Sequence, residues 1–441
     1  MARDRSKHED TTKASTHSLA RRAVFVALVM LLGGATGLGT LLGAAAATDR
    51  PPLFLLAGLF VFCAVYLLGL MLATRGISPS RRRRVRVGLF CAGTVLVVGA
   101  FAWTALLPMV DPRLPPAAVA GQRFWELPTG SRIAYVHVPA GGDARQTPVI
   151  FLHGGPGTPD IKGDSEYFGK LAGSGFDVYV YDAVGTGRSS RLEAPRGYTL
   201  ARDVADLEAV REKIGATRVI LIGHSYGGTL AAAYASSHPD RVARMVLSFP
   251  GDPSPSAGGA SMTFRLTTKE KLGVYALLLP PRPMLAYALL QVNPEAAHAF
   301  ASDAELDARQ DRIYNRTRPA LHCRNKPPGP ELHGLGFFAN QYPQSAAREP
   351  RPDFLPSLRR LDTPTLVIKG RCDYLSWSSA QEYLDALPDA RLLYLNDSGH
   401  NAYQDEPERY MAGVRAFLLD RPLPEHPYEG DRMPEGYEGP P

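Results

Sequence analysis

One serine in this chain of 441 residues lies in a motif whose residue types could carry out nucleophilic chemistry. Ser225 is the middle residue of Gly-His-Ser-Tyr-Gly at 223–227, between an apolar run at 219–222 and an alanine-rich stretch at 229–237. This order predicts a buried strand, a tight turn with the serine at its tip, and then a helix. Gly223 and Gly227, two positions before and after Ser225, are small enough to permit the turn. The N-terminus of the following helix favours developing negative charge. We therefore predict that Ser225 is a nucleophile.

A serine hydroxyl at neutral pH needs a base that accepts its proton, and the base needs an acid that orients it. When the nucleophile lies in such a motif, the acid and then the histidine follow it along the chain. His400 comes after the last predicted strand, 392–395, and Asp373 comes just after the predicted strand 365–368. Open parallel sheets bind ligands at the carboxyl ends of their strands. These positions predict His400 as the base and Asp373 as the acid.

Two other aspartates in this part of the chain compete with Asp373 for the role of the acid. Asp362 precedes the strand 365–368 and therefore lies at the opposite end of it. Asp397 is only three residues from His400, and we expect it to cap its own loop. Asp373 is therefore the preferred acid.

A glycine-rich loop could stabilise the negative charge that develops when the serine attacks a carbonyl group. The loop is His-Gly-Gly-Pro-Gly at 153–157, and it directly follows the apolar run 149–152. Glycines there allow backbone N–H groups to point at an oxyanion, so we expect one donor from this loop. We expect the second donor to be the backbone N–H of Tyr226, the residue after the nucleophile.

The elements that must position these residues alternate between short apolar runs and helical patterns. The runs predicted as strands are 132–138, 149–152, 178–181, 219–222, 245–247, 365–368 and 392–395. Helical patterns at 200–214 and 229–237 lie between them. Such alternation predicts a mostly parallel sheet with helices on both faces. Because the alternation stops near Pro250 and resumes near Pro364, we predict a cap or lid at 251–355.

Four short segments of the chain resemble the prolyl iminopeptidase branch of the α/β hydrolases. They are 153–157, 223–228, Gly-Arg-Cys-Asp at 370–373 and Ser-Gly-His at 398–400. The similarity extends over residues 122–420 and implies an α/β-hydrolase fold with a helical cap insertion. It also implies Gly155 and Tyr226 as oxyanion donors. The activity it implies is the release of an N-terminal residue, often proline, from peptides or small amides.

The resemblance further implies an acidic side chain, typically in the cap, that holds the free amine of the substrate. Glu331 in Gly-Pro-Glu-Leu at 329–332 is the candidate, and a solvated loop carboxylate is the competing interpretation. The chain departs from the family in two places. Asp182 is followed by Ala-Val where the family often has Gln-Arg, and Tyr374 stands where some relatives have a second acid. Hydrolysis is therefore predicted more strongly than aminopeptidase activity.

These residues are compatible with three functions. The leading hypothesis is a serine aminopeptidase that acts on small peptides. The second is an esterase or amidase that acts on small acyl substrates with the same triad. The third is a non-enzymatic membrane sensor with a hydrolase fold, which the complete set of Ser225, Asp373 and His400 disfavours. Epoxide hydrolases and dehalogenases need a carboxylate nucleophile, so Ser225 argues against both.

The formal net charge of +6 would fit nucleic-acid binding, but the positive charge is concentrated at one end of the chain. Residues 1–86 contain 13 Lys and Arg against four Asp and Glu, which leaves 36 basic and 39 acidic residues in the rest. Because no basic stripe with interleaved aromatic residues is present, we predict no nucleic-acid partner. Cys323 and Cys372, the two cysteines outside the apolar runs, have no metal-type spacing. No metal and no organic cofactor are predicted.

Three charge-free apolar runs, 23–47, 53–73 and 87–109, are each long enough to cross a bilayer as a helix. Basic residues gather in the N-terminal tail and at 75–86, so the positive-inside rule places both in the cytoplasm. The catalytic domain then lies outside the cytoplasm, tethered to the lipid bilayer. A cleaved signal peptide that ends near Ala47 is the alternative interpretation of the first run.

The chain is accordingly divided into seven segments. They are a basic cytoplasmic tail (1–22), three transmembrane helices (23–109), a linker (110–121), the first part of the core (122–250), the cap (251–355), the second part of the core (356–420) and a disordered tail (421–441). Cys323 in the cap and Cys372 beside Asp373 would share an oxidising compartment in this topology. A disulfide between them is a further hypothesis.

Overall fold

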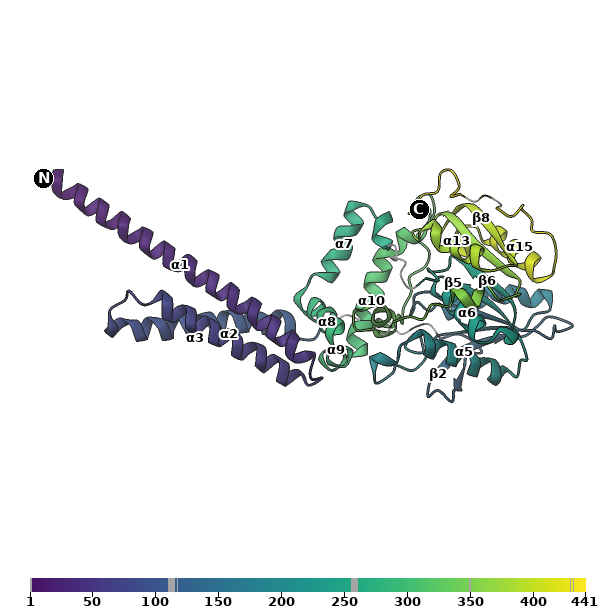
Figure 1. The fold of residues 1–441 in the computed structure, drawn as a ribbon, viewed down its shortest axis with the longest axis horizontal. Coiled ribbons are helices and arrows are strands. Elements are labelled where there is room, and N and C mark those ends of the chain that lie inside the picture. Colours follow the sequence, from purple (N-terminus) through teal and green to yellow (C-terminus); the bar gives the residue numbers. More distant parts are fainter. Residues whose placement is uncertain are drawn as a thin grey trace. The chain divides into compact units, whose positions relative to one another are not determined.

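The computed structural model describes residues 2–109, 116, 118–254, 261–348, 350–428, 430 and 432–441 (Figure 1). The chain forms two compact units. We call Met1–Met109 with Pro280–Ala301 the helical unit, and Val110–Leu279 with Ser302–Pro441 the sheet unit. Most of the linker predicted at 110–121 lies outside the described residues.

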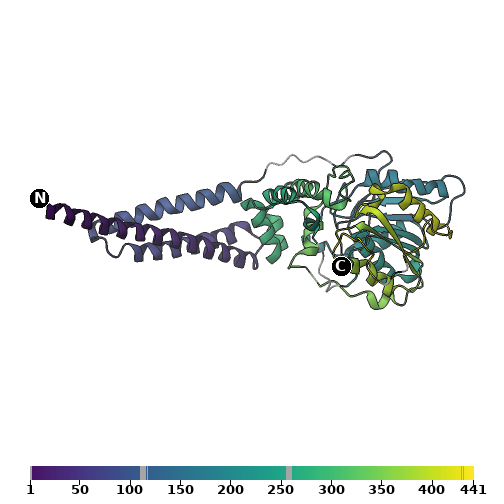
Figure 2. The ribbon, with the colours of Figure 1, turned by 90° about the horizontal axis from the view of Figure 1, so that it is seen from above.

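The helical unit contains the three long N-terminal helices (Figures 1 and 2), of which the first packs against the second and the second against the third. They are α1 (Ala2–Ala45), α2 (Pro51–Ala73) and α3 (Pro79–Phe101), and α3 continues into the π-helical turn η1 (Ala102–Leu106). The segments Ala20–Ala45, Pro51–Ala73 and Pro79–Leu106 are long and apolar enough to cross a membrane. The apolar runs of the sequence therefore form the expected helices.

Small residues allow α1 and α2 to approach each other closely. A Cβ atom added at Gly37 would lie 2.9 Å from the carbonyl oxygen of Gly58, and one added at Gly58 would lie 2.8 Å from that of Gly37. Backbone contact at small residues is a common way for membrane helices to pack. The hydroxyl of Tyr66 in α2 donates to the carbonyl of Leu89, which attaches α3 at 2.9 Å.

Two short helices from the predicted cap belong to the helical unit instead. They are α8 (Pro281–Val292) and α9 (Pro294–Phe300). The guanidinium of Arg282 donates to the carbonyls of Ala105 at 3.2 Å and Leu106 at 3.0 Å, and the amide of Asn293 donates to Ala45 at 2.8 Å. These bonds satisfy carbonyl groups at helix ends that have no partner within the helix. The segment 251–355 is therefore divided between the two units.

The sheet unit is built on eight strands in the order β1-β2-β4-β3-β5-β6-β7-β8. The strands are β1 (Arg123–Glu126), β2 (Arg132–Val138), β3 (Val149–Leu152), β4 (Val178–Tyr181), β5 (Val219–His224), β6 (Val242–Ser248), β7 (Thr365–Cys372) and β8 (Ala390–Gly399). Strands β1 and β2 pair antiparallel, and β4, β3, β5, β6, β7 and β8 pair parallel. The predicted mostly parallel α/β-hydrolase sheet is confirmed.

The order of the strands changes direction between β3 and β5. From β3 the chain adds β4 on one side of the sheet and β5 on the other. In open α/β sheets, ligands bind at the carboxyl ends of the strands at such a switch point. The loop 153–157 follows β3, and Ser225 follows β5, so both predicted parts of the site lie at this position.

Helices connect these strands and cover the sheet (Figure 1). They are α4 (Ile161–Phe168), α5 (Leu200–Ile214), α6 (Tyr226–Ser237), α13 (Trp377–Ala386), α14 (Ala402–Asp405) and α15 (Pro407–Leu418). Helices α4 and α15 contribute Phe168 and Val414 to one core cluster with sheet residues such as Phe151 and Ile222. Burial of this apolar surface stabilises the sheet on which the site is built.

The part of the predicted cap that stays with the sheet unit consists of short helices and turns. These are α7 (Thr268–Leu278), α10 (Asp303–Thr317), α11 (Phe337–Gln341) and α12 (Leu355–Leu358). The 3-10 turns of the unit are η2 (Gly169–Ser174), η3 (Pro195–Gly197), η4 (Pro239–Arg241), η5 (Met262–Arg265), η6 (Arg318–Leu321) and η7 (Tyr342–Gln344). Buried Asp311 in α10 accepts from the N–H groups of Gly334 at 3.1 Å and Leu335 at 2.9 Å, and thus holds the segment before α11.

The described residues of the C-terminal segment 421–441 are packed, so the prediction of a disordered tail is corrected. The backbone N–H of Tyr428 donates to the carbonyl of Leu392 at 2.8 Å, and that of Trp377 donates to Pro440 at 2.9 Å. The Tyr437 side chain is 9% exposed. The average composition of this segment hides Tyr437, an aromatic residue that buries a large apolar surface.

Candidate active site

Ser225 lies at the predicted tight turn between β5 and α6. Its φ of 54° and ψ of −118° form a left-handed conformation that is unusual for a residue other than glycine. Its backbone N–H donates to the carbonyl of Ser248 at 2.8 Å. A Cβ atom at Gly223 would lie 2.2 Å from the Gly227 carbonyl, and one at Gly227 would lie 2.1 Å from that of Leu152. The turn therefore requires glycine at both places.

Asp373 and His400 are brought together at the carboxyl ends of β7 and β8. The Nδ1 atom of His400 lies 2.8 Å from the Oδ1 atom of Asp373, and both side chains are buried. Because a carboxylate can only accept, Nδ1 carries the proton and Nε2 is left as an acceptor. His400 and Ser225 line one cavity of about 390 Å³. This arrangement leaves a basic nitrogen on a residue that lines the same cavity as Ser225.

A lysine that sequence analysis missed holds the other oxygen of Asp373. The Nζ atom of Lys369 lies 2.7 Å from Oδ2 and also donates to the carbonyl of Ser376 at 2.8 Å. The backbone N–H of Leu375 donates to Oδ1 at 3.2 Å. Burial by itself would raise the pKa of Asp373, but Lys369 and then His400 outweigh it and hold that pKa well below the usual range. Asp373 is therefore a carboxylate at neutral pH.

The glycine-rich loop is positioned beside the serine. Gly155 has a φ of 122°, which favours glycine, and it lines the cavity together with Ser225. Tyr226 is the first residue of α6, where backbone N–H groups have no acceptor within the helix. A Cβ atom at Gly154 would lie 3.1 Å from that of Ser225, which shows how closely loop and serine approach. The two predicted oxyanion donors thus lie on the segments that flank the serine.

His153 at the start of this loop has a structural environment. Its Nδ1 atom lies 2.9 Å from the Gly154 carbonyl, and its Nε2 atom accepts from the backbone N–H of Ala183 at 3.0 Å. Burial lowers the pKa of His153 to about 4, against the opposing effect of the bond to Gly154. Ala183 lies where the sequence departs from the family pattern after Asp182. It still supports the glycine-rich loop, because its backbone N–H donates to His153.

The two competing aspartates are placed elsewhere. Asp362 is exposed at the start of β7, away from the carboxyl end that carries Asp373. Asp397 lies in β8, where its Oδ2 atom is 2.7 Å from the Nζ atom of Lys326. Its Oδ1 atom accepts from Asn325 at 3.0 Å. Neither aspartate contacts His400 in the described residues.

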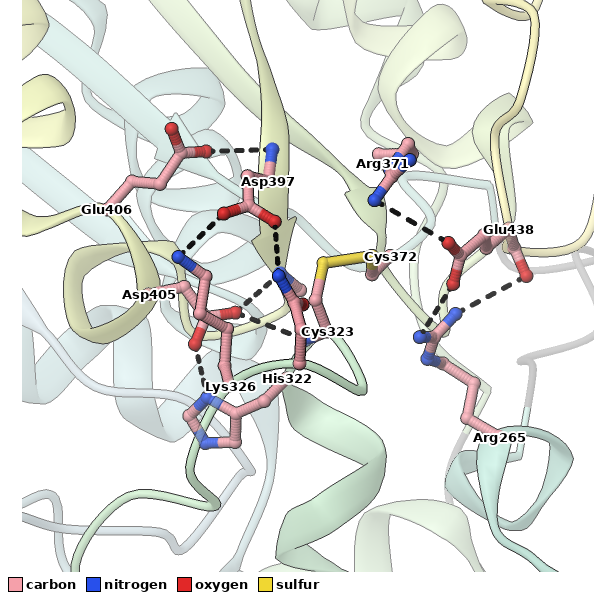
Figure 3. The surroundings of a disulfide bond; sticks show 12 residues. Arg265, His322, Cys323, Lys326, Arg371, Cys372, Asp397, Asp405, Glu406 and Glu438 are labelled. Carbon is pink, nitrogen blue, oxygen red and sulfur yellow. Dashed lines mark hydrogen bonds and ion pairs between the residues drawn. A yellow bond between two sulfur atoms is a disulfide. The ribbon is translucent and has the colours of Figure 1, made fainter.

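A disulfide joins Cys323 to Cys372, the residue before Asp373 (Figure 3). This confirms the pairing hypothesis. The carboxylate of buried Asp405 holds the surrounding segments, because it accepts from His322 Nδ1 at 2.6 Å and from the backbone N–H groups of Cys323 at 3.3 Å and Gly399 at 2.7 Å. The segment 322–323, which follows η6, is thereby attached to the loops that carry Asp373 and His400.

Glu331 does not lie where the resemblance implied. Its side chain is 63% exposed, and its Oε1 atom pairs with Arg318 at 3.3 Å. It does not line the cavity of Ser225, although the next residue, Leu332, does. The structure therefore gives no support to Glu331 as the group that holds an amine, because its side chain is mostly exposed and pairs with Arg318.

Two carboxylates that sequence analysis missed do line the cavity. They are Asp160 and Asp164, at the start of α4. Aspartates at a helix start are common as capping residues, and Asp160 does cap α4 by accepting from Gly163 at 3.0 Å. The only signal in the sequence was a second aspartate four residues later, which has no capping role.

Comparison with known proteins agrees with this architecture. A family model described as the alpha/beta hydrolase fold matches residues 147–407. The chain belongs to the α/β-hydrolase fold family. It is 29% identical to a mouse (Lyso)-N-acylphosphatidylethanolamine lipase over 66% of this chain and 84% of that one. It is 26% identical to a proline iminopeptidase of Lactiplantibacillus plantarum over 66% of this chain and 99% of that one.

Among solved structures, an esterase from Exiguobacterium antarcticum aligns with a TM-score of 0.46 and 19% identity, over 67% of this chain and 98% of that chain. The named relatives of this α/β hydrolase include lipases and peptidases. The chain is thus a hydrolase of this fold.

Proposed function

We propose that this α/β hydrolase is a membrane-anchored serine hydrolase, with Ser225 as nucleophile, His400 as base and Asp373 as the acid that orients His400. The observation that carries the proposal is the bond of 2.8 Å between His400 and Asp373 beside a cavity that Ser225 also lines. The strained turn at Ser225 adds support, because such strain clusters at functional sites.

The proposed reaction begins when the Ser225 hydroxyl attacks the carbonyl carbon of the substrate. Nε2 of His400 accepts the serine proton and then donates it to the leaving group. Asp373 keeps the imidazole oriented and stabilises its positive charge. The N–H groups of Gly155 and Tyr226 donate to the oxyanion of the tetrahedral intermediate. A water molecule, activated by His400, then releases the acyl group from Ser225.

The favoured substrate is a small peptide whose N-terminal residue, with proline preferred, is released. The motif at 153–157 and the relatives named proline iminopeptidase support this choice. The second candidate is an esterase or amidase that acts on small acyl substrates with the same triad. The relatives named as lipases favour that candidate.

We further propose that the sheet unit lies outside the cytoplasm. The arginines at 81–84, between the second and third apolar segments, favour a cytoplasmic position for that link. Three membrane crossings would then place the sheet unit on the other side. The disulfide between Cys323 and Cys372 is consistent with an oxidising compartment.

A panel of proline, alanine and acetyl-proline anilides tests the proposal with the full chain in detergent. The aminopeptidase predicts cleavage of the free-amine anilides, loss of cleavage when the amine is acetylated, and no cleavage by Ser225→Ala. Equal cleavage of blocked and free substrates would favour the esterase or amidase. Activity that survives in Ser225→Ala would contradict the proposed nucleophile.

A further inference from the structure

Helix α7 of the predicted cap carries exposed apolar side chains along one face. Leu272, Tyr275 and Leu279 are 64%, 44% and 61% exposed, and Ala276 beside them is exposed as well. Steps of three, four and seven residues place these four residues on one side of a helix, and we call them the outer face of α7. Apolar residues at this spacing normally pack on a core, so their exposure indicates a surface that contacts something outside the sheet unit.

The opposite side of α7 is already packed within the sheet unit. Val274 is 2% exposed and forms a small core cluster with Leu266 and Ala320. The guanidinium of Arg309 in α10 donates to the carbonyl of Leu277 near the end of α7. These contacts fix which side of the helix is turned inward. The outer face is therefore not a second core surface that a small rotation of α7 would bury.

The chain that follows α7 leads to the ends of two proposed membrane spans. Only two residues separate α7 from α8. Arg282 of α8 donates to the carbonyl of Leu106, at the end of the third apolar segment, and Asn293 donates to that of Ala45, at the end of the first. The first and third segments cross a membrane in the same direction, so both ends lie on one side of it. The short connection therefore keeps the carboxyl end of α7 near that membrane surface in the proposed topology.

The distribution of charge along α7 fits an approach to lipid. Its first turn contains Lys269, Glu270 and Lys271, whereas residues 272–281 contain no charged side chain. The helix thus changes from polar to apolar towards the end that connects to α8. Tyrosine, which lies within the apolar part as Tyr275, is enriched where membranes meet water. A lipid surface accounts for this direction of change, because the apolar end is also the end that the chain keeps near the membrane.

We propose that the outer face of α7 lies in the interfacial layer of the lipid bilayer, on the side that holds the sheet unit. The inference rests on the proposed membrane anchoring and adds an interaction surface to it. The apolar side chains of the outer face contact acyl chains just below the headgroups, and Lys269 and Lys271 lie towards the phosphate groups. Helix α10, which holds α7 through Arg309, also contributes Gln310 and Tyr314 to the cavity of Ser225. The lipid-bound helix thus supports one wall of that cavity.

Fluorescence quenching by lipid tests this surface in the full chain. In a background without Cys63 and Cys91, the variants Leu272→Cys and Leu279→Cys are labelled with bimane and reconstituted into phosphatidylcholine vesicles. Part of the lipid carries a nitroxide on the fifth carbon of one acyl chain. This lipid should reduce the fluorescence of both labelled variants by about twofold or more. The matched control is Asp143→Cys, at an exposed charged position of the sheet unit, which should keep its fluorescence.

A positive control separates this surface from the anchoring on which it rests. Val95, which is 72% exposed in the third apolar segment, should be quenched as Val95→Cys if that segment crosses the bilayer. Quenching at Val95 and Leu279 but not at Leu272 would overturn the surface and leave the anchoring intact, because the connection to α8 explains Leu279. No quenching at Val95 would contradict the anchoring and the surface together. Disulfide cross-linking of Leu272→Cys between two copies, without quenching, would assign the outer face to a protein contact and overturn the proposal. None of these results depends on catalysis by Ser225.

Discussion

The Nζ atom of Lys369 lies 2.7 Å from the Oδ2 atom of Asp373, and both side chains are completely buried. The proposed acid is therefore held between an ammonium group on one oxygen and the imidazole of His400 on the other. A buried carboxylate of this kind stays charged only when its partners stay in place. Lys369 thus positions Asp373 and stabilises its ionised form, although it does not line the cavity of Ser225.

Lys369→Met should destabilise the sheet unit, because it leaves the carboxylate of Asp373 buried without its cation. Loss of one partner of a buried pair costs about 3–5 kcal/mol. Thermal melting of the full chain in detergent should show a marked fall in Tm. The matched control is Lys326→Met, because Lys326 also pairs with an aspartate at 2.7 Å but near the surface. That pair is expected to contribute about 0–1 kcal/mol, so equal losses in both variants would contradict the account.

Asp203 should make the fold less stable as the pH rises. Burial raises its pKa to about 7, although a bond from the Tyr226 hydroxyl at 2.6 Å opposes this effect. Because the pKa of Asp203 is higher in the folded state than in the unfolded state, the stability that this group contributes is fully present below about pH 4 and is lost as the pH rises towards 7. Asp203→Asn should remove roughly 2–4 kcal/mol of this pH dependence. Melting curves at pH 4.5, 6 and 7.5 check it, and identical slopes for both proteins would refute the prediction.

The disulfide between Cys323 and Cys372 should stabilise the segment that carries Asp373. Its replacement in Cys323→Ser/Cys372→Ser should cost about 2–4 kcal/mol and reduce kcat, because the loop before Asp373 loses an attachment. The control is Cys63→Ser/Cys91→Ser, which removes the two free cysteines. That protein should keep the unaltered Tm and remain sensitive to reductant. An unchanged Tm in the first double variant would argue against a stabilising role.

The proposed topology predicts which side of the membrane each segment faces. In a background without Cys63 and Cys91, single cysteines can be introduced at exposed positions as Ser80→Cys and Asp143→Cys. A membrane-impermeant maleimide added to intact cells should label the second variant and not the first. After the membrane is permeabilised, both should be labelled. The reverse pattern would place the sheet unit in the cytoplasm.

Local patterns were enough to predict much of the fold and the order of the candidate triad. Seven of the eight strands were predicted, and the missing one, Arg123–Glu126, is an edge strand of four residues whose two aromatic residues lie between charged ones. The turn at Ser225 was predictable because its two glycines are required by contacts within the turn itself. The neighbouring positions of Asp373 and His400, which follow β7 and β8, were predictable because the carboxyl ends of parallel strands lie at one edge of a sheet.

Features that depend on contacts between distant segments were not predictable. A lysine such as Lys369 within a buried strand gives no sign of its partner, because the pairing depends on how the chain returns after β7. Asp164 resembles an ordinary residue of a first helical turn until the cavity is seen. Glu331 was chosen by its position in the chain, which does not determine the direction of a loop side chain, and it is mostly exposed and paired with Arg318.

The central claim is that Ser225 is a nucleophile activated by His400 and Asp373. Mass spectrometry of the full chain after treatment with a fluorophosphonate tests it most directly. The account predicts a single phosphonyl adduct on the peptide that contains Ser225, and its strong reduction in His400→Ala and Asp373→Ala proteins that still fold. A folded protein without an adduct at Ser225, or with equal labelling in the three proteins, would contradict the account.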